Sequence, residues 1–295
     1  MPSEHDTNIY PGAALIATGL ALHGLCKGSL SASGSAAAWV VGYGHLAGPV
    51  KVFGVAMIAF YLIGSRATKV KAATKATLED GPDPSKPGGN RNAVQVLSNS
   101  LPSLLAAIAY RLYASDASPL FQPGLGRQLI FAALGHFATC LGDTLASELG
   151  ILSRSKPTHI LTLAPVPPGT NGAVSPLGLA ASAAGGTIMA LVVALDLAIE
   201  DRAGSSWAAA TQLLGFGTAA GLVGSLLDSL LGATLQRTLY STTDGRVLTD
   251  LSSAERENAP GVVTIGPGIN VLSNSAVNFI CASVMAGVGY WVGGL

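Results

Sequence analysis

The chain has 295 residues, of which 49% are hydrophobic and only 11% are charged, and its formal net charge is zero. Soluble domains carry about 25% charged residues, so this composition excludes an ordinary soluble protein and indicates one that crosses a membrane several times. A net charge of zero also gives no electrostatic basis for binding nucleic acid.

A helix that crosses a bilayer needs about 20 mostly apolar residues. About eight segments approach this requirement, and we predict one all-α domain, residues 1–295, built as a polytopic transmembrane helix bundle. Alanine, glycine and serine are frequent in these segments and predict interfaces rich in small residues. The predicted spans are 11–26, 31–48, 50–65, 92–113, 128–149, 175–199, 206–232 and 270–292.

Lysine and arginine gather in three long loops, 66–91, 150–174 and 233–269, which eight spans would bring to one end of the bundle. Because basic residues favour the cytoplasmic side, we assign these loops to the cytoplasm. The expected location is a multi-pass integral membrane protein of the endoplasmic reticulum or another endomembrane.

The first long loop carries Arg66 and Lys69 at its start and Gly88-Gly89-Asn90-Arg91 at its end. The basic run can bind phosphate or lie against anionic lipid headgroups, and composition alone favours the second interpretation. The paired glycines let backbone amides converge on an anion, to which Arg91 can add a two-bond contact. A plain turn before the next span explains the same residues equally well.

A Gly-Asp-Thr-Leu-Ala-Ser-Glu sequence from residue 142 ends the fifth predicted span and holds Asp143 and Glu148. A charge at the centre of a bilayer costs about 2.5–3.5 kcal/mol, so such acids usually face a protein interior or an aqueous cavity. Several oxygen ligands at one helix end suit Mg²⁺. Pairing with Arg154 or Lys156 in a helix cap is the structural alternative, and we favour the functional one.

Asp228 lies between Gly224 and Gly232 near the end of the seventh predicted span. Close packing of helices explains the glycines but not the carboxylate. The two acid-bearing helix ends suggest two related half-sites that face one pocket.

Gly169-Thr170-Asn171-Gly172 precedes the sixth predicted span and suggests an anion site at a helix N-terminus. It is not a Walker motif, because no Gly-Lys-Ser/Thr follows. In the last span Asn270, Asn274 and Asn278 are four residues apart and form one amide stripe. The stripe either joins two helices or lines a polar site.

These motifs resemble those of the transmembrane protein 19 family, also called domain of unknown function 92, from about Gly64 to about Ser283. The family includes plant phytyl-phosphate kinase, and its Gly-Asp-x-x-Ala segment is similar to that of CTP-dependent polyprenol kinases. The resemblance implies an all-helical membrane kinase that transfers phosphate from a nucleotide, CTP by this likeness, to a prenyl monophosphate such as phytyl or geranylgeranyl phosphate.

On this basis a membrane lipid is the expected partner, and Mg²⁺ is the expected metal, with Asp143, Glu148 and Asp228 as its expected ligands. Association between copies of the chain is left open. The predicted catalytic residues are Asp143, Glu148, Asp228 and Arg91. The residues predicted to bind the nucleotide and the phosphates are Arg66, Lys69, Gly88, Gly89, Asn90, Gly169, Thr170, Asn171, Gly172, Asn274 and Asn278.

Two other functions stay open. A multi-pass transporter would also bury acids beside glycines, and it is expected to contain discontinuous helices. A membrane protein without catalytic activity is the third possibility.

Overall fold

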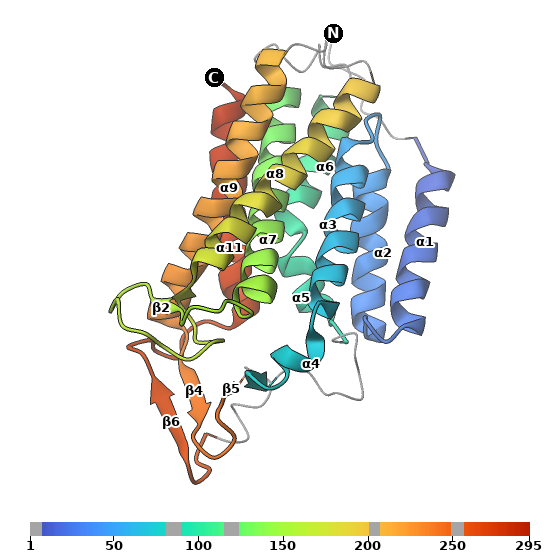
Figure 1. The fold of residues 1–295 in the computed structure, drawn as a ribbon. Coiled ribbons are helices and arrows are strands. Elements are labelled where there is room, and N and C mark those ends of the chain that lie inside the picture. The colour runs from blue at the N-terminus through green and yellow to red at the C-terminus, as the bar shows by residue number, and fades with distance from the viewer. Residues whose placement is uncertain (1–7, 81–89, 115–123, 201–206, 249–256) are drawn as a thin grey trace.

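The computed structural model describes residues 8–80, 90–114, 124–200, 207–248 and 257–295, which form a bundle whose long helices run alternately between its two ends (Figure 1). The long helices are α1 (Pro11–Cys26), α2 (Ala32–Leu46), α3 (Val52–Lys69), α6 (Leu101–Tyr113), α7 (Leu125–Gly150), α8 (Pro176–Ile199), α9 (Trp207–Leu235) and α11 (Asn274–Gly293). Two short helices, α4 (Ala72–Lys75) and α5 (Ala93–Ser98), follow α3 and precede α6.

Within the described residues, five helices are long and apolar enough to cross a bilayer: α3, α7, α8, α9 and α11. Helices α1 and α6 are apolar but shorter, with 16 and 13 residues. The structure therefore confirms a helical multi-pass membrane protein, whereas the number of eight spans is not confirmed.

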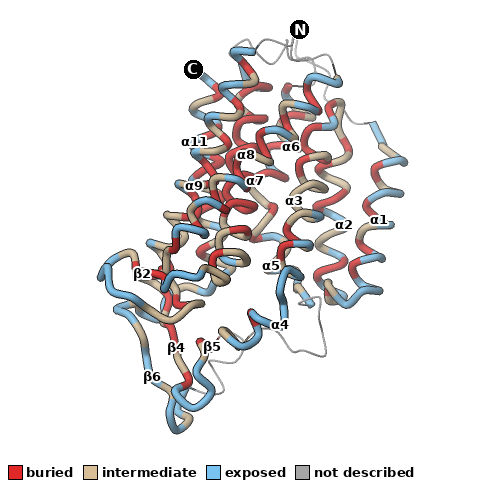
Figure 2. Tube along the Cα trace, viewed as in Figure 1, coloured by how far each residue is buried: buried red, intermediate tan, exposed pale blue. Residues whose placement is uncertain are grey.

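Helix α7 is the centre of the bundle, and Figure 2 shows the buried trace concentrated around it. It packs against α3, α6, α8, α9 and α11, and most of its residues are buried. Glycines make the closest of these contacts. A Cβ on Gly142 would lie 2.7 Å from the carbonyl oxygen of Gly221, and one on Gly185 would lie 2.8 Å from Gly142 Cα. Small residues thus let the backbones of α7, α8 and α9 touch.

The predicted span 92–113 is not one helix, because the chain leaves the helical conformation at Asn99 and Ser100. Pro102 explains the break: it suits the first turn of a new helix, but it cannot continue the hydrogen bonding of the preceding one. Side chains replace the lost bonds. Asn99 Nδ2 donates to Gln95 O at 2.9 Å, and Ser100 Oγ donates to Val96 O at 2.7 Å.

The three long polar loops meet at one end of the bundle, here called the loop end, while α1 begins and α11 ends at the opposite end (Figure 1). Their contact includes short strands that the sequence analysis did not predict. A four-stranded sheet has the order β1-β5-β4-β6, formed by Glu79–Asp80, Arg246–Leu248, Thr238–Ser241 and Val262–Ile265. Strand β1 of the first loop pairs in parallel with β5 of the third loop.

The second loop contains a two-stranded antiparallel sheet of β2 (Thr158–His159) and β3 (Ala173–Val174). It is tied to the third loop, because Asn171 N donates to Thr238 Oγ1 at 3.0 Å. The prediction that the three loops share one end is confirmed, and the compartment which that end faces stays a prediction.

Helix α11 begins at Asn274, four residues later than predicted. The amides of Val271 and Leu272 both donate to Leu235 O at 3.0 Å, which holds this segment against the end of α9 instead of in a helix. Asn270 is therefore exposed outside the helix, and the amide stripe consists of Asn274 and Asn278.

Candidate functional site

A cavity of about 1140 Å³ opens at the loop end and extends into the bundle. Most of the predicted site residues line it, although they come from α7, α9, α11 and two loops. These residues are Arg91, Asp143, Glu148, Gly169, Thr170, Asn171, Gly172, Asp228, Asn274 and Asn278. One cavity thus gathers motifs that lie far apart in the sequence.

The remaining predicted residues lie elsewhere. Arg66 and Lys69 occupy the last turn of α3, are exposed, and do not line the cavity. Cations at a helix C-terminus are favoured by the helix dipole, which accounts for both without a ligand. Asn90 is exposed with a φ of 42°, and it is not part of the lining. Gly88 and Gly89 lie outside the described residues.

Asp143 projects from α7 into the cavity beside α9. Ser225 Oγ of α9 donates to Asp143 Oδ1 at 3.3 Å. The contact depends on two nearby glycines, because Gly142, next to Asp143, and Gly221, one turn before Ser225, allow the two helix backbones to approach closely. The seam of small residues therefore orients a carboxylate that the sequence analysis selected for its chemistry.

Asp228 of α9 lies close enough to Asp143 for the two carboxylates to interact electrostatically. The amide of Asn278 on α11 lies between Asp228 and Asn99. In one orientation its nitrogen donates to Asn99 Oδ1 at 3.4 Å; in the other it donates to Asp228 Oδ2 at 3.1 Å and to Asn274 O at 3.2 Å. The second orientation satisfies the carboxylate, and it makes the predicted amide stripe part of the site.

The helix break at Asn99 also faces this cavity. Asn99 O accepts a hydrogen bond from His136 Nε2 of α7 at 3.0 Å. A broken helix inside a membrane bundle is tolerated where neighbouring groups satisfy the freed backbone, and His136 does so here. The break was missed in the sequence, although Pro102 was a visible signal.

Glu148 is not grouped with the other two acids. It forms a partly buried ion pair with Lys75 of α4, whose Nζ also donates to Thr68 O at 2.8 Å and Ala67 O at 3.2 Å. The partner of Glu148 is therefore Lys75, and not Arg154 or Lys156, which the sequence suggested as cap partners. Among the described residues, no three carboxylate, imidazole or thiol groups gather closely enough to hold a metal. The predicted three-acid set is therefore reduced in the structure to the pair Asp143 and Asp228.

Lys75 is the functional candidate that the sequence analysis missed. Its side chain is only 8% exposed, and it lines the cavity. Its local sequence, Ala72-Ala73-Thr74-Lys75-Ala76, gave no distinguishing signal, because Lys71 likewise lies between two apolar residues, Val70 and Ala72.

Glu79 of β1 lies beside this ion pair at the cavity wall. Burial raises the pKa of its carboxyl group above the ordinary value, the nearby Glu148 raises it further, and Lys75 acts in the opposite direction. The carboxylate also borders the second loop, since a Cβ on Gly169 would lie 3.4 Å from Glu79 Oε2.

The Gly169–Gly172 segment packs tightly onto α9. Both glycines have positive φ, 86° and 76°, and a Cβ on Gly172 would lie 2.4 Å from Ala233 Cβ. The backbone amides of Thr170 and Asn171 already donate to Pro167 O and Thr238 Oγ1. The segment therefore forms a shaped wall of the cavity, with fewer amides directed at a ligand than the sequence suggested.

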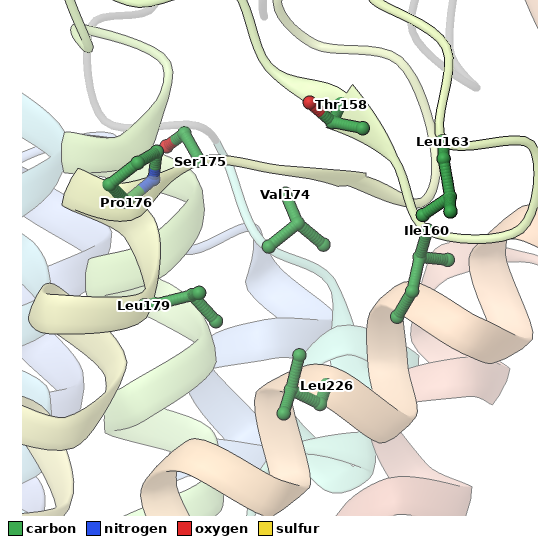
Figure 3. A pocket seen from close by; sticks show the side chains of 8 residues that line it. All are labelled: Thr158, Ile160, Leu163, Val174, Ser175, Pro176, Leu179 and Leu226. Atoms are coloured by element: carbon green, nitrogen blue, oxygen red, sulfur yellow. The ribbon is translucent and has the colours of Figure 1, made fainter.

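A second, smaller pocket of about 260 Å³ lies between the second loop and helices α8 and α9 (Figure 3). Its lining is mostly apolar, with Ile160, Leu163 and Leu226 around its rim. Ser175 contributes little polarity, because its hydroxyl accepts from Gly178 N and donates to Gly150 O. The chemistry of the charged groups therefore belongs to the larger cavity.

The chain is similar to a known family of integral membrane proteins. The family model described as integral membrane protein DUF92 matches residues 15–286. Protein PGR of Arabidopsis thaliana is 35% identical over 273 residues, which cover 91% of this chain and 90% of that protein. An uncharacterized membrane protein of Synechocystis is 31% identical over 183 residues, covering 61% of this chain and 62% of that protein.

An uncharacterized membrane protein of Methanocaldococcus jannaschii is 35% identical over 104 residues, covering 35% of this chain and 39% of that protein. No solved structure matches the chain significantly.

Proposed function

The chain belongs to the DUF92 family of integral membrane proteins, and we propose that it is a kinase that transfers the terminal phosphate of a nucleotide to an isoprenyl monophosphate in the membrane. The proposed donor is CTP, and the proposed acceptors are of the phytyl or geranylgeranyl phosphate type.

One observation carries the proposal: a single cavity joins a polar site to an apolar interior. Asp143 and Asp228 line its part near the loop end, whereas Met57 and Phe137 line its part within the bundle. A soluble nucleotide can reach the first part, and a hydrocarbon chain is compatible with the second. A lipid that carries a phosphate needs both kinds of surface at once.

The donor atoms at the polar end fit a hard cation. Mg²⁺ is usually held by one or two carboxylates together with substrate phosphates, and Asp143 and Asp228 offer two carboxylates. Ser225 and Asn278 hold these groups in position through hydrogen bonds. When bound, the ion supplies positive charge that offsets the charge of the phosphates.

The protein's own cations contribute in the same way. Arg91 lines the cavity, and its planar guanidinium can make two hydrogen bonds to one phosphate. Lys75 is held by Glu148 and by two carbonyls of α3, so we assign it the role of fixing the cavity wall.

An oxygen of the acceptor's phosphate forms a bond to the γ-phosphorus of the nucleotide, the bond to the β,γ-bridging oxygen breaks, and the nucleoside diphosphate leaves. A phosphate monoester has a second pKa of about 6, so it is already mostly dianionic at neutral pH and no residue has to remove a proton. Alignment and charge neutralisation are then the main tasks of the site.

A transporter is the second candidate, and one observation favours it. The break between α5 and α6 is a discontinuous helix whose unwound residue Asn99 lines the cavity. Transporters often place such breaks at their substrate sites. The grouping of the carboxylates with the polar loops at one end favours the kinase.

The test of the proposal is a screen with purified protein in liposomes. Geranyl, phytyl and geranylgeranyl monophosphates are each offered with CTP or ATP and Mg²⁺, and the lipid products are separated. Formation of the corresponding diphosphate supports the kinase; uptake of a solute without any diphosphate supports the transporter. An endomembrane such as the endoplasmic reticulum is the proposed location, because it would present the loop end to cytoplasmic nucleotides.

A further inference from the structure

We infer that the hydrocarbon chain of the acceptor leaves the site between the α1–α2 pair and α3, and that Ala38 and Met57 help to decide which chains fit. This inference deepens the proposed function and rests on it for the identity of the ligand. The location of the chain follows from the lining of the cavity alone.

The inner part of the cavity has the polarity that such a chain requires. On α3, the lining residues Met57, Tyr61, Gly64 and Thr68 are three or four positions apart and so form one stripe along the helix. The stripe changes from apolar to polar toward the loop end. Gly64 lies beside α7, where an added Cβ would make an ordinary contact with Thr144 Cγ2 at 3.7 Å.

The cavity is too shallow for a long chain to lie wholly along the bundle axis. Phe137 lines its inner part and lies six residues before Asp143 on α7, a rise of about 9 Å. Aromatic rings close this inner end: Phe60 and Phe137 are 6.0 Å apart between centroids, and Phe137 and His45 are 5.6 Å apart. A long chain must therefore turn sideways below these rings.

The lining indicates the direction of that turn. Beyond α3 it continues over Ala38 and Val41 of α2 and reaches Leu20 of α1. Helix α1 packs mainly against α2, and its outward residues such as Leu15 are strongly exposed. The apolar wall thus connects the carboxylates to the outermost helix of the bundle, next to the lipid.

The first test maps the chain without requiring catalysis. A geranylgeranyl monophosphate with a photoreactive group at the far end of its chain is incorporated into liposomes with the wild-type protein and irradiated. We expect crosslinks in peptides of α1, α2 and α3, and competition by unlabelled geranylgeranyl monophosphate. Crosslinks confined to the small pocket around Ile160 and Leu226, or crosslinks that competitor does not reduce, would overturn the inference.

The second test uses matched variants on α2. Ala38→Trp fills the proposed passage, whereas Val40→Trp changes a residue that is 55% exposed and does not line the cavity. Ala38→Trp should reduce the competed crosslinking and lower the ratio of kcat/KM for geranylgeranyl over geranyl phosphate by about tenfold or more. Val40→Trp should change neither. Equal effects of the two variants would contradict the inference.

The two proposals can fail separately. Competed crosslinks on α1–α3 without any diphosphate product would leave the chain site in place and remove the kinase. Diphosphate formation with crosslinks outside α1–α3 would support the kinase and remove the proposed chain site.

Discussion

Lys75 and Glu148 form a partly buried ion pair although 73 positions separate them in the sequence. The ammonium group of Lys75 also binds two carbonyl oxygens in the last turn of α3. One side chain thereby joins α4 to the ends of α3 and α7, which together border the cavity. The pair is an interaction on which the shape of the candidate site depends.

Removing one member of this pair should destabilise the protein. Breaking a buried ion pair costs about 3–5 kcal/mol, and we expect about 2–3 kcal/mol for Lys75→Met because Glu148 keeps 23% exposure and so some hydration. The measurement is equilibrium or thermal unfolding in detergent. Adding Glu148→Gln to Lys75→Met should recover part of the loss, since no charge is then left unpaired. Strictly additive losses would mean that the pair contributes nothing.

Asp143→Asn and Asp228→Asn should each abolish phosphate transfer while leaving the unfolding temperature almost unchanged. Each change keeps the side chain's volume but removes a hard-cation ligand. Asp196→Asn is the control, because Asp196 is a buried acid near the C-terminus of α8, at the opposite end of the bundle, and does not line the cavity. Full activity in Asp143→Asn would show that this carboxylate is not needed.

Arg91→Lys should reduce kcat/KM strongly although the charge is kept, because an ammonium cannot reproduce the two-bond contact of a guanidinium with phosphate. Arg66→Lys is the matched control, since Arg66 is exposed outside the cavity lining. Initial rates at varied acceptor concentration give the comparison. If the two variants lose activity equally, Arg91 has no special role in binding phosphate.

Stability should depend on the pH through Glu79. Its pKa in the folded protein is raised above the ordinary 4.5, so the folded state binds this proton more tightly than the unfolded chain. Ionisation of Glu79 therefore reduces stability as the pH rises from 4.5 through the raised pKa. Glu79→Gln should unfold at a higher temperature than wild type at neutral pH and at the same temperature below pH 4.5.

Glu257 is the control for that experiment, because its pKa is shifted in the opposite direction from that of Glu79. The pKa of this exposed carboxyl is lowered by its hydrogen bond to Arg237, so Glu257→Gln should be neutral or slightly destabilising at neutral pH. A Glu79→Gln variant that behaves like Glu257→Gln would show that burial does not dominate at Glu79.

Much of the fold and part of the site follow from local sequence. Long apolar segments give the helices, because each must satisfy its own backbone in a membrane. The sequence analysis selected Asp143 and Asp228 because they are acids beside glycines in apolar segments, and both line the cavity. The resemblance to a family was confirmed by the match over residues 15–286.

The remaining features depend on tertiary contacts that no local pattern contains. The partner of Glu148 is set by where α4 folds back, so Lys75 could not be distinguished from its basic neighbours by charge alone. Arg66 and Lys69 were expected at the site, but α3 continues past residue 65, and both residues are exposed on its last turn. The strands at the loop end pair across loops that are distant in sequence, such as Glu79 with Val247.

We propose that Asp143 and Asp228 support phosphate transfer to a membrane lipid phosphate. The measurement that tests this role is the rate of diphosphate formation from geranylgeranyl monophosphate and CTP in liposomes, with and without Mg²⁺, for wild type, Asp143→Asn and Asp228→Asn. We expect diphosphate from wild type with Mg²⁺, and none from wild type without Mg²⁺ or from either variant. Equal product from wild type and both variants, or no product from wild type with any donor or prenyl phosphate while the liposomes show solute flux, would contradict this proposal.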